Sequence, residues 1–281
     1  MNRERLRRLA REVLPDWARE ILAFSVRKKR ALLPRYAFSF SNASEDRSES
    51  PFPFLVSSGN ALEELGARYR PTKRRHNYLP YYWMHFRDIR FTVKSVLEIG
   101  VQTDRSIRMW EEFFPHATIH GIDIDPECRR FEGGRRRLFI GDQSDRGFLR
   151  RVVDQSDGAF DIVIDDGSHR VDHQLRTFDF LFPTMSDHGI YVVEDTGGCV
   201  GDPELATVSS LTALVDSIMY WPKRFQPSDW MYLSEFPPDA KWVDKNVIGI
   251  AFYRWIVFIM RGRNPRDNPF LASLPREQKA V

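Results

Sequence analysis

The 281-residue sequence contains only two cysteines, Cys128 and Cys199, which lie far apart in the chain. They offer neither a disulfide framework nor the ligand spacing of a zinc site, and we interpret them as ordinary thiols in a reducing compartment. The sequence also has no run of roughly 18 apolar residues, and its first residues lack the apolar core and cleavage site of a signal peptide. These absences predict a soluble, cytoplasmic protein.

The chain has little net charge, +3 in total, but basic residues are concentrated at its start. Residues 1–35 contain 11 Lys and Arg against four Asp and Glu, and residues 27–30 are all basic. Apolar residues recur every three or four positions between Leu6 and Phe24, which predicts a basic amphipathic helical extension over residues 1–38. Such a segment suits a cap on the domain, a homo-oligomer contact or peripheral contact with an anionic membrane, and the sequence leaves these alternatives open.

The rest of the chain predicts one α/β domain. Residues 39–68 are interpreted as a linker and loop that lead into a domain of residues 69–265, and residues 266–281 as a C-terminal tail. Buried strands are expected at 95–101, 118–125, 137–142, 160–165 and 190–194, with helical stretches between them. An antiparallel pair over 247–260 completes a Rossmann-like, doubly wound, mostly parallel seven-stranded sheet.

Acidic residues follow two of these strands. Asp165, Asp166 and His169 end the run that begins at Phe160, and Glu194 and Asp195 end the run that begins at Gly189. Because the carboxyl ends of parallel strands meet at one edge of a sheet, these side chains are expected to converge on one pocket. Oxygen ligands beside a histidine suit a hard divalent cation and a proton-abstraction step.

The chain lacks the three glycines of a dinucleotide fingerprint, because the first strand is followed by Gly100 alone, so NAD and FAD are disfavoured. An acid nevertheless follows each of the next two strands. Asp123 is placed to bind a ribose or, alternatively, to cap its own loop. Asp142 and the neighbouring Gln143 are placed to meet an adenine amine or, alternatively, to cap a helix.

Several segments together resemble the metal-dependent sugar O-methyltransferases of macrolide biosynthesis, over roughly residues 70–260. They are Val96–Val101, Ser106–Trp110, Gly121–Asp125, Gly141–Asp145, Asp165–His169 and Ile190–Asp195. The resemblance implies a class I methyltransferase fold that binds S-adenosylmethionine and Mg²⁺. It implies that Asp166, Glu194 and Asp195 hold the metal and that His169 is the general base, with Asp166 also catalytic. The cofactor-binding residues would be Glu98, Gly100, Ser106, Asp123, Asp142, Gln143 and Asp165.

The implied acceptor is a small glycosylated molecule: a secondary metabolite, a glycolipid or a saccharide. Two alternatives stay open. A metal-dependent hydrolase could use Asp165, Asp166 and Glu194 to activate water, and a cofactor-binding or docking protein could keep the fold without turnover.

The segment from Tyr69 to Tyr82 resembles the family's Gly-Thr-Asp-Lys and His-x-Tyr elements, although the glycine and the aspartate are replaced here. The family's paired glycines after the first strand are likewise replaced by Thr103 and Asp104. The basic cluster of residues 73–76 is interpreted as a solvated surface, since no evenly spaced aromatic platform for nucleic acid accompanies it. Tyr78, Tyr82 and Trp83 are expected to pack on the sheet or close over the cofactor, and residues 197–201 to form an acceptor-site lid.

Overall fold

The computed structural model describes residues 59–156, 159–196, 207–212, 214–215 and 241–263. The predicted basic extension of residues 1–38, the predicted lid at 197–201 and the predicted tail of 266–281 lie outside these residues. Among the described residues, no helix has both the length and the apolar character needed to cross a membrane.

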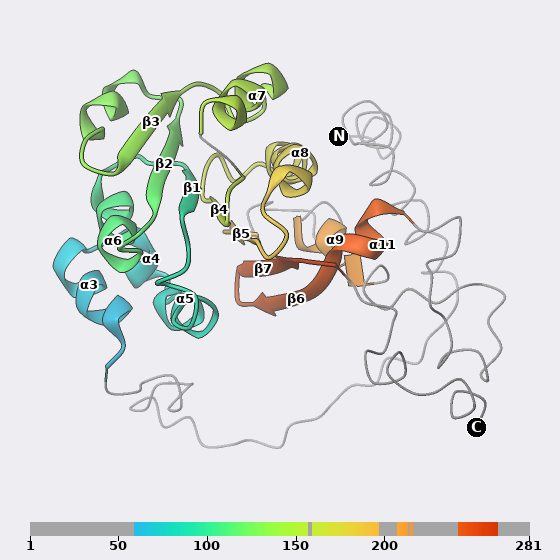
Figure 1. The fold of residues 1–281 in the computed structure, drawn as a ribbon, viewed down its shortest axis with the longest axis horizontal. Coiled ribbons are helices and arrows are strands. Elements are labelled where there is room, and N and C mark those ends of the chain that lie inside the picture. The colour runs from blue at the N-terminus through green and yellow to red at the C-terminus, as the bar shows by residue number, and fades with distance from the viewer. Residues whose placement is uncertain (1–58, 157–158, 197–206, 213, 216–240, 264–281) are drawn as a thin grey trace, which may run out of the picture.

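One seven-stranded sheet forms the centre of the described structure, with the strand order β3-β2-β1-β4-β5-β7-β6 (Figure 1). Neighbouring strands from β3 to β5 pair in parallel, and β7 pairs antiparallel with both β5 and β6. This arrangement confirms the doubly wound, mostly parallel sheet with a terminal antiparallel pair. The strands are β1 (Ser95–Ile99), β2 (Thr118–Asp123), β3 (Arg136–Ile140), β4 (Ile162–Asp165), β5 (Ile190–Glu194), β6 (Val247–Tyr253) and β7 (Ile256–Arg261).

Helices cover both faces of the sheet, and alternate strand residues supply two hydrophobic cores. On one face, Val96 and Ile164 pack with residues of α3, α5 and α6. On the other face, Leu97 and Val163 pack with residues of α7 and α8. Strands covered on both faces read as continuous apolar runs, which is why the sequence marks them so clearly.

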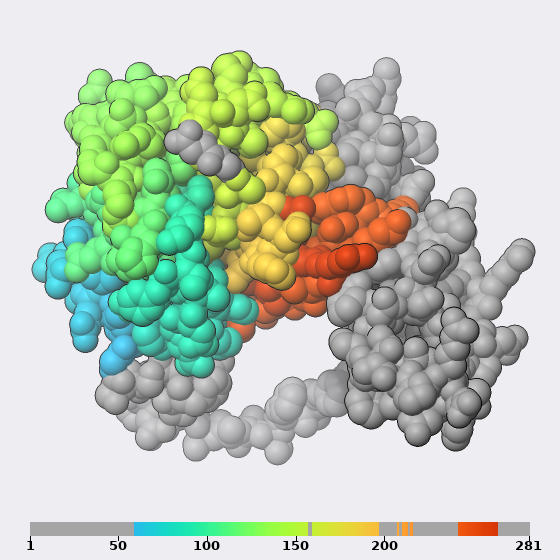
Figure 2. Space-filling view, viewed as in Figure 1, coloured from blue at the N-terminus to red at the C-terminus, as the bar shows by residue number. Residues whose placement is uncertain are grey.

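The helices lie around the sheet as Figure 1 shows. They are α3 (Ala61–Tyr69), α4 (Thr72–Arg75), α5 (Leu79–Phe86), α6 (Arg105–Phe113), α7 (Arg146–Asp154), α8 (Val171–Leu181), α9 (Thr207–Leu211) and α11 (Trp242–Asn246), with 3₁₀ turns η2 (Pro126–Phe131) and η3 (Phe182–Thr184). The described elements form one continuous body from α3, in blue, to the β6–β7 hairpin, in red (Figure 2).

The first described helix, α3, crosses the predicted domain boundary at residues 68 and 69. Asn60 caps it, because its side-chain oxygen accepts hydrogen bonds from the backbone N–H groups of Leu62 and Glu63. Leu62 and Leu65 are buried against the core that α5 and α6 share. The helix therefore packs as part of the domain.

Candidate active site

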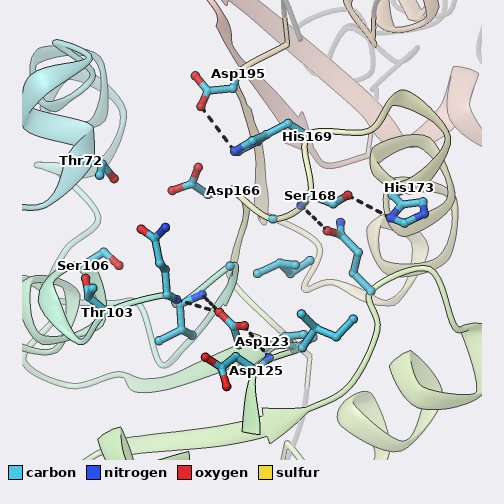
Figure 3. A pocket seen from close by; sticks show the side chains of 18 of the residues that line it. Thr72, Thr103, Ser106, Asp123, Asp125, Asp166, Ser168, His169, His173 and Asp195 are labelled. Atoms are coloured by element: carbon cyan, nitrogen blue, oxygen red, sulfur yellow. Dashed lines mark hydrogen bonds and ion pairs between the residues drawn. The ribbon is translucent and has the colours of Figure 1, made fainter. Parts of the chain in front are cut away.

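A cavity of about 510 Å³ opens at the carboxyl ends of the parallel strands (Figure 3). Its volume falls in the range of small-molecule and cofactor sites. Most of the predicted site residues line it: Gly100, Ser106, Asp123, Asp142, Gln143, Asp166, His169 and Asp195. Glu98, Asp165 and Glu194 do not line it and are at most 1% exposed. The structure thus divides the predicted site into a lining layer and a buried layer.

Gly100 lets the loop after β1 approach the loop after β4. Its φ is +89°, and an added Cβ would lie 2.1 Å from the backbone oxygen of Asp166. A side chain here would meet backbone, which cannot rotate away. The absence of a side chain at Gly100 therefore permits the close approach of the two loops.

Glu98 lies beneath this loop and is fully buried. Its carboxylate accepts hydrogen bonds from the hydroxyl of Ser106 at 2.7 Å and from the indole N–H of Trp110 at 3.2 Å. The ammonium of Lys73 lies 3.0 Å away. Glu98 therefore fixes α6 and the segment around Lys73, and its carboxylate does not reach the cavity.

Asp123 lines the cavity, but its carboxylate is turned to backbone groups (Figure 3). Oδ2 accepts hydrogen bonds from the N–H groups of Val101 and Gln102 at 2.9 and 2.7 Å. Oδ1 accepts one from the N–H of Asp125 at 2.9 Å. In this structure the side chain joins the loop after β1 to its own loop, and the predicted contact with a ribose stays a prediction.

The loop after β3 is organised in a similar way. Asp142 accepts a hydrogen bond from the N–H of Ser144, which together with other local interactions lowers the pKa of its carboxyl group. Gln143 donates to Asp165 at 3.1 Å and accepts from the N–H of Ser168 at 2.8 Å. Gln143 therefore joins the loops that follow β3 and β4. The helix that begins here, α7, is capped by Asp145.

Asp165 is a buried carboxyl group behind the cavity lining. Burial raises the pKa of Asp165 to about 6, and its hydrogen bonds with Gln143, Gly167 and Tyr191 only partly offset this effect. Asp165 does not line the cavity, and its role in cofactor binding stays a prediction.

Three candidate metal-ligating and catalytic residues meet at one end of the cavity. Ligand atoms of Asp166, His169 and Asp195 all lie within 4.8 Å of one another. His169 Nε2 is 3.7 Å from Asp195 Oδ2 (Figure 3). Both residues have positive φ, 54° for His169 and 51° for Asp195. Such backbone conformations are uncommon outside glycine and concentrate at functional sites.

Below this cluster lies a buried layer that the sequence did not predict correctly. Lys73 was expected on a solvated surface, but its side chain is fully buried. Its ammonium lies 2.5 Å from Asp166 Oδ2 and 2.7 Å from Glu194 Oε1. Burial alone would lower the pKa of Lys73, but the facing carboxylates of Asp166, Glu194 and Glu98 raise it well above its usual value. Lys73 is therefore an internal cation.

Glu194 has one bonded and one bare carboxylate oxygen. Tyr82 and Lys73 both donate to Oε1, whereas Oε2 is buried and has no partner among the described residues. Burial and the negative charge of Asp166 raise the pKa of Glu194 to about 8, although Lys73 and Tyr82 act in the opposite direction. An unpartnered buried carboxylate oxygen suits a divalent cation that prefers oxygen ligands, although Glu194 lies outside the group formed by Asp166, His169 and Asp195.

Two further residues border the cluster from the segment before α5. Tyr78 donates a hydrogen bond to Asp195 Oδ1 at 2.6 Å, and His76 Nδ1 lies 3.7 Å from the same oxygen. His76 also lines the cavity. The rings of Tyr78 and Tyr82 are buried, as expected for an aromatic segment that packs on the sheet, and their hydroxyl groups contact Asp195 and Glu194. The His-x-Tyr spacing was the available signal for this contact. Closure of this segment over the cofactor stays a prediction.

Comparison with known proteins finds no matching family model. Among curated proteins, the mycinamicin VI 2''-O-methyltransferase of Micromonospora griseorubida is 36% identical over 226 residues, which are 72% of this chain and 53% of that protein. The demethylmacrocin O-methyltransferase of Streptomyces fradiae is 34% identical over the same shares of the two chains. The chain thus spans about half the length of the curated relatives it matches.

The structural comparison agrees. The MycE methyltransferase of the mycinamycin pathway, solved in complex with Mg, SAH and mycinamycin VI, superposes with a TM-score of 0.63 at 34% identity. The match covers 75% of this chain and 58% of that one. By its sheet order and site, the described domain is a class I methyltransferase fold. Within that class, the chain is homologous to the macrolide and sugar O-methyltransferases, which confirms the resemblance found in the sequence.

Proposed function

We propose that this protein is an S-adenosylmethionine-dependent, Mg²⁺-assisted O-methyltransferase that methylates a sugar hydroxyl of a glycosylated small molecule. The observation that carries the proposal is the convergence of Asp166, His169 and Asp195 at one end of a cavity whose other walls are the loops after β1, β2 and β3. That cavity places a cofactor-sized space directly beside a candidate acid–base and metal cluster.

The metal would be held by Asp166 and Asp195, whose ligand atoms lie within 4.8 Å of each other. Glu194 lies outside that group and does not line the cavity, but its buried, unpartnered Oε2 is our candidate for a third oxygen. When bound, Mg²⁺ would make a sugar hydroxyl more acidic, and S-adenosylmethionine would supply the methyl group. The donor set supports this assignment because three carboxylates offer the hard oxygen ligands that Mg²⁺ prefers.

His169 would act as the general base. Its side chain is 38% exposed and lines the cavity, and its Nε2 faces Asp195. Because Nδ1 of His169 is buried, Nε2 is the nitrogen that would take the proton, and the carboxylate of Asp195 beside it would stabilise the imidazolium that forms. The proton would pass from the hydroxyl to His169 as the oxygen–carbon bond forms and the carbon–sulfur bond of the sulfonium breaks, which leaves S-adenosylhomocysteine.

The acceptor class follows from relatives whose names contain a glycosyl group, the rhamnosyl group of a tetracenomycin C and the olivosyl group of an oleandolide. We propose a glycosylated secondary metabolite, with glycolipids and saccharides as the other sources of a sugar hydroxyl. Membrane contact or oligomerisation through residues 1–38 concerns a segment outside the described residues and stays a prediction.

The test is transfer of a labelled methyl group from S-adenosylmethionine to a panel of glycosylated metabolites, with Mg²⁺ and with EDTA. We expect methyl transfer that requires Mg²⁺ and is lost in Asp166→Asn. Binding of S-adenosylmethionine with no transfer to any acceptor of the panel would favour a protein without turnover. Release of a hydrolysis product without any use of the cofactor would favour the hydrolase.

A further inference from the structure

Lys73 is a fully buried charge to which neither the proposed mechanism nor the relatives' names give a role. Its ammonium is within 3.0 Å of three carboxylates, those of Glu98, Asp166 and Glu194. These acids come from three different strands or strand ends, 25, 93 and 121 residues from Lys73 along the chain. One side chain therefore joins the end of β1 to the ends of β4 and β5.

We propose that Lys73 is a positioning residue of the metal site: its ammonium holds one oxygen each of Asp166 and Glu194, so that their remaining oxygens face the metal. This inference rests on the proposed function, since it assigns a role in binding the Mg²⁺ that the function requires.

The hydrogen bonds support this division of the oxygens. Lys73 bonds Oδ2 of Asp166, while Asp166 also belongs to the cluster with His169 and Asp195. Lys73 and Tyr82 both bond Oε1 of Glu194, and Oε2 is left bare. Groups that orient metal ligands in this way are commonly needed for metal affinity.

The location of Lys73 also links the residues that line the cavity to the buried carboxylates behind them. Pro71, Thr72 and His76 line the cavity, while Lys73 points below it. The segment that contains α4 therefore contributes both to the wall and to the carboxylate layer beneath the metal site. A solvated lysine in this segment could not do so.

A positioning role and a simple charge effect predict opposite results when Lys73 is replaced. Lys73→Met removes a positive charge next to the metal site, and by electrostatics alone this would tighten the binding of a cation. If Lys73 positions Asp166 and Glu194, the same change weakens metal binding, by roughly 10- to 100-fold. The sign of the change separates the two explanations.

The experiment is a titration of the purified full chain with Mn²⁺, followed by electron paramagnetic resonance, with S-adenosylhomocysteine binding measured separately by calorimetry. Lys94→Met is the matched control, because Lys94 is exposed and immediately precedes β1. We expect weaker Mn²⁺ binding and a changed Mn²⁺ spectrum in Lys73→Met, and wild-type behaviour in Lys94→Met.

A second variant keeps the test decisive if Lys73→Met does not fold. Lys73→Met combined with Glu98→Gln removes one charge of each sign, so the net charge near the metal is kept. If Lys73 positions the ligands, this double variant still binds Mn²⁺ more weakly than wild type. If only the net charge matters, it binds Mn²⁺ with wild-type affinity.

Unchanged or tighter Mn²⁺ binding in a folded Lys73 variant would overturn the proposal. A charge-balanced double variant that fails to fold would also count against it, because Lys73 would then be a folding requirement. Failure of the proposed function itself has a different signature: the wild-type chain would bind no Mn²⁺ or no S-adenosylhomocysteine.

Discussion

The two halves of the cavity satisfy their carboxylates in different ways. After β2 and β3, Asp123 and Asp142 accept hydrogen bonds from nearby backbone N–H groups. After β4 and β5, Asp166 and Glu194 contact a buried ammonium that comes from a distant part of the chain. The first half is held by hydrogen bonds from backbone N–H groups of the same and of a neighbouring loop, and the second depends on ion pairs with a buried ammonium.

This difference separates structural from chemical roles. A carboxylate that accepts backbone hydrogen bonds, three for Asp123 and one for Asp142, stabilises its loop. A buried layer of carboxylates around an internal cation, with the Oε2 of Glu194 unpartnered, is costly to bury, and such an unpartnered atom calls for an explanation such as an ion. We therefore expect substitutions in the second half to affect chemistry and those in the first half to affect mainly loop order and cofactor affinity.

The largest effect is expected at His169. His169→Ala removes the base, so we predict that kcat for methyl transfer falls by roughly 10²- to 10⁴-fold. Binding of S-adenosylhomocysteine should be retained, because the loops after β1 to β3 are unchanged. His116→Ala, at an exposed position outside the cavity, is the control and should keep wild-type turnover. Equal turnover in His169→Ala and wild type would contradict the assignment of His169 as the general base.

Gly100 joins the two halves, and its replacement should damage both. In Gly100→Ala the new Cβ would meet the backbone of Asp166, so we predict a loss of about 3 kcal/mol in unfolding free energy and loss of cofactor binding. Gly59→Ala is a matched control, since Gly59 has a similar φ of +101° but nothing within 4 Å of the added Cβ. Denaturant unfolding measures the stability of both variants, and calorimetry measures their cofactor binding. If the two substitutions lowered the unfolding free energy equally, the positive φ, and not the contact with Asp166, would be the cause of the loss.

Asp165 gives the metal-free protein a dependence of stability on pH. Burial raises its pKa from 3.8 to about 6 in the folded state, so between these values the folded protein holds a proton that the unfolded chain has released. The stabilising contribution is present below about pH 4 and is lost as the pH rises through 6. It amounts to at most about 3 kcal/mol.

Asp165→Asn should remove the part of this dependence that Asp165 contributes, because the amide does not titrate. Glu194, whose pKa is raised to about 8, should give both proteins the same further loss of stability as the pH rises. Urea unfolding between pH 4 and 8 in EDTA measures it, with the exposed Asp88→Asn as control. If Asp165→Asn and wild type lose stability in parallel over this window, the buried carboxyl is not its origin.

The smallest effects are expected in the first half of the cavity. Asp123→Ala removes three hydrogen bonds from backbone groups, so we predict about tenfold weaker binding of S-adenosylmethionine, equivalent to about one net hydrogen bond. Asp142→Asn keeps an acceptor for Ser144 and should change affinity by less than about threefold. Calorimetry compares the two. A larger effect at Asp142 would indicate direct contact with the cofactor there.

The sheet could be predicted from the sequence because its strands are short apolar runs that end in polar residues. The runs at 95–101 and 160–165 contain β1 and β4, and the hairpin turn near residues 253–255 lies between β6 and β7. Parallel strands that are covered on both faces leave this pattern irrespective of the rest of the chain.

The site could be predicted only in part. Asp166, His169 and Asp195 follow strands, and strand order brings them together. Lys73 lies in a run of basic residues that reads as surface, and its burial depends on acids that are far away in sequence. Available signals were Glu98, an acid within an apolar strand, and the lysine shared with the family's Gly-Thr-Asp-Lys element. A buried acid in a strand favours a buried cation as its partner, and this lysine is a candidate for that cation.

The most direct test of this account is a calorimetric titration of the metal-stripped protein with S-adenosylmethionine, in buffer with and without Mg²⁺. The account predicts saturable binding at one site, which Gly100→Ala abolishes and His169→Ala leaves intact. No detectable binding at millimolar ligand, in either buffer, would contradict the assignment of the cavity to this cofactor.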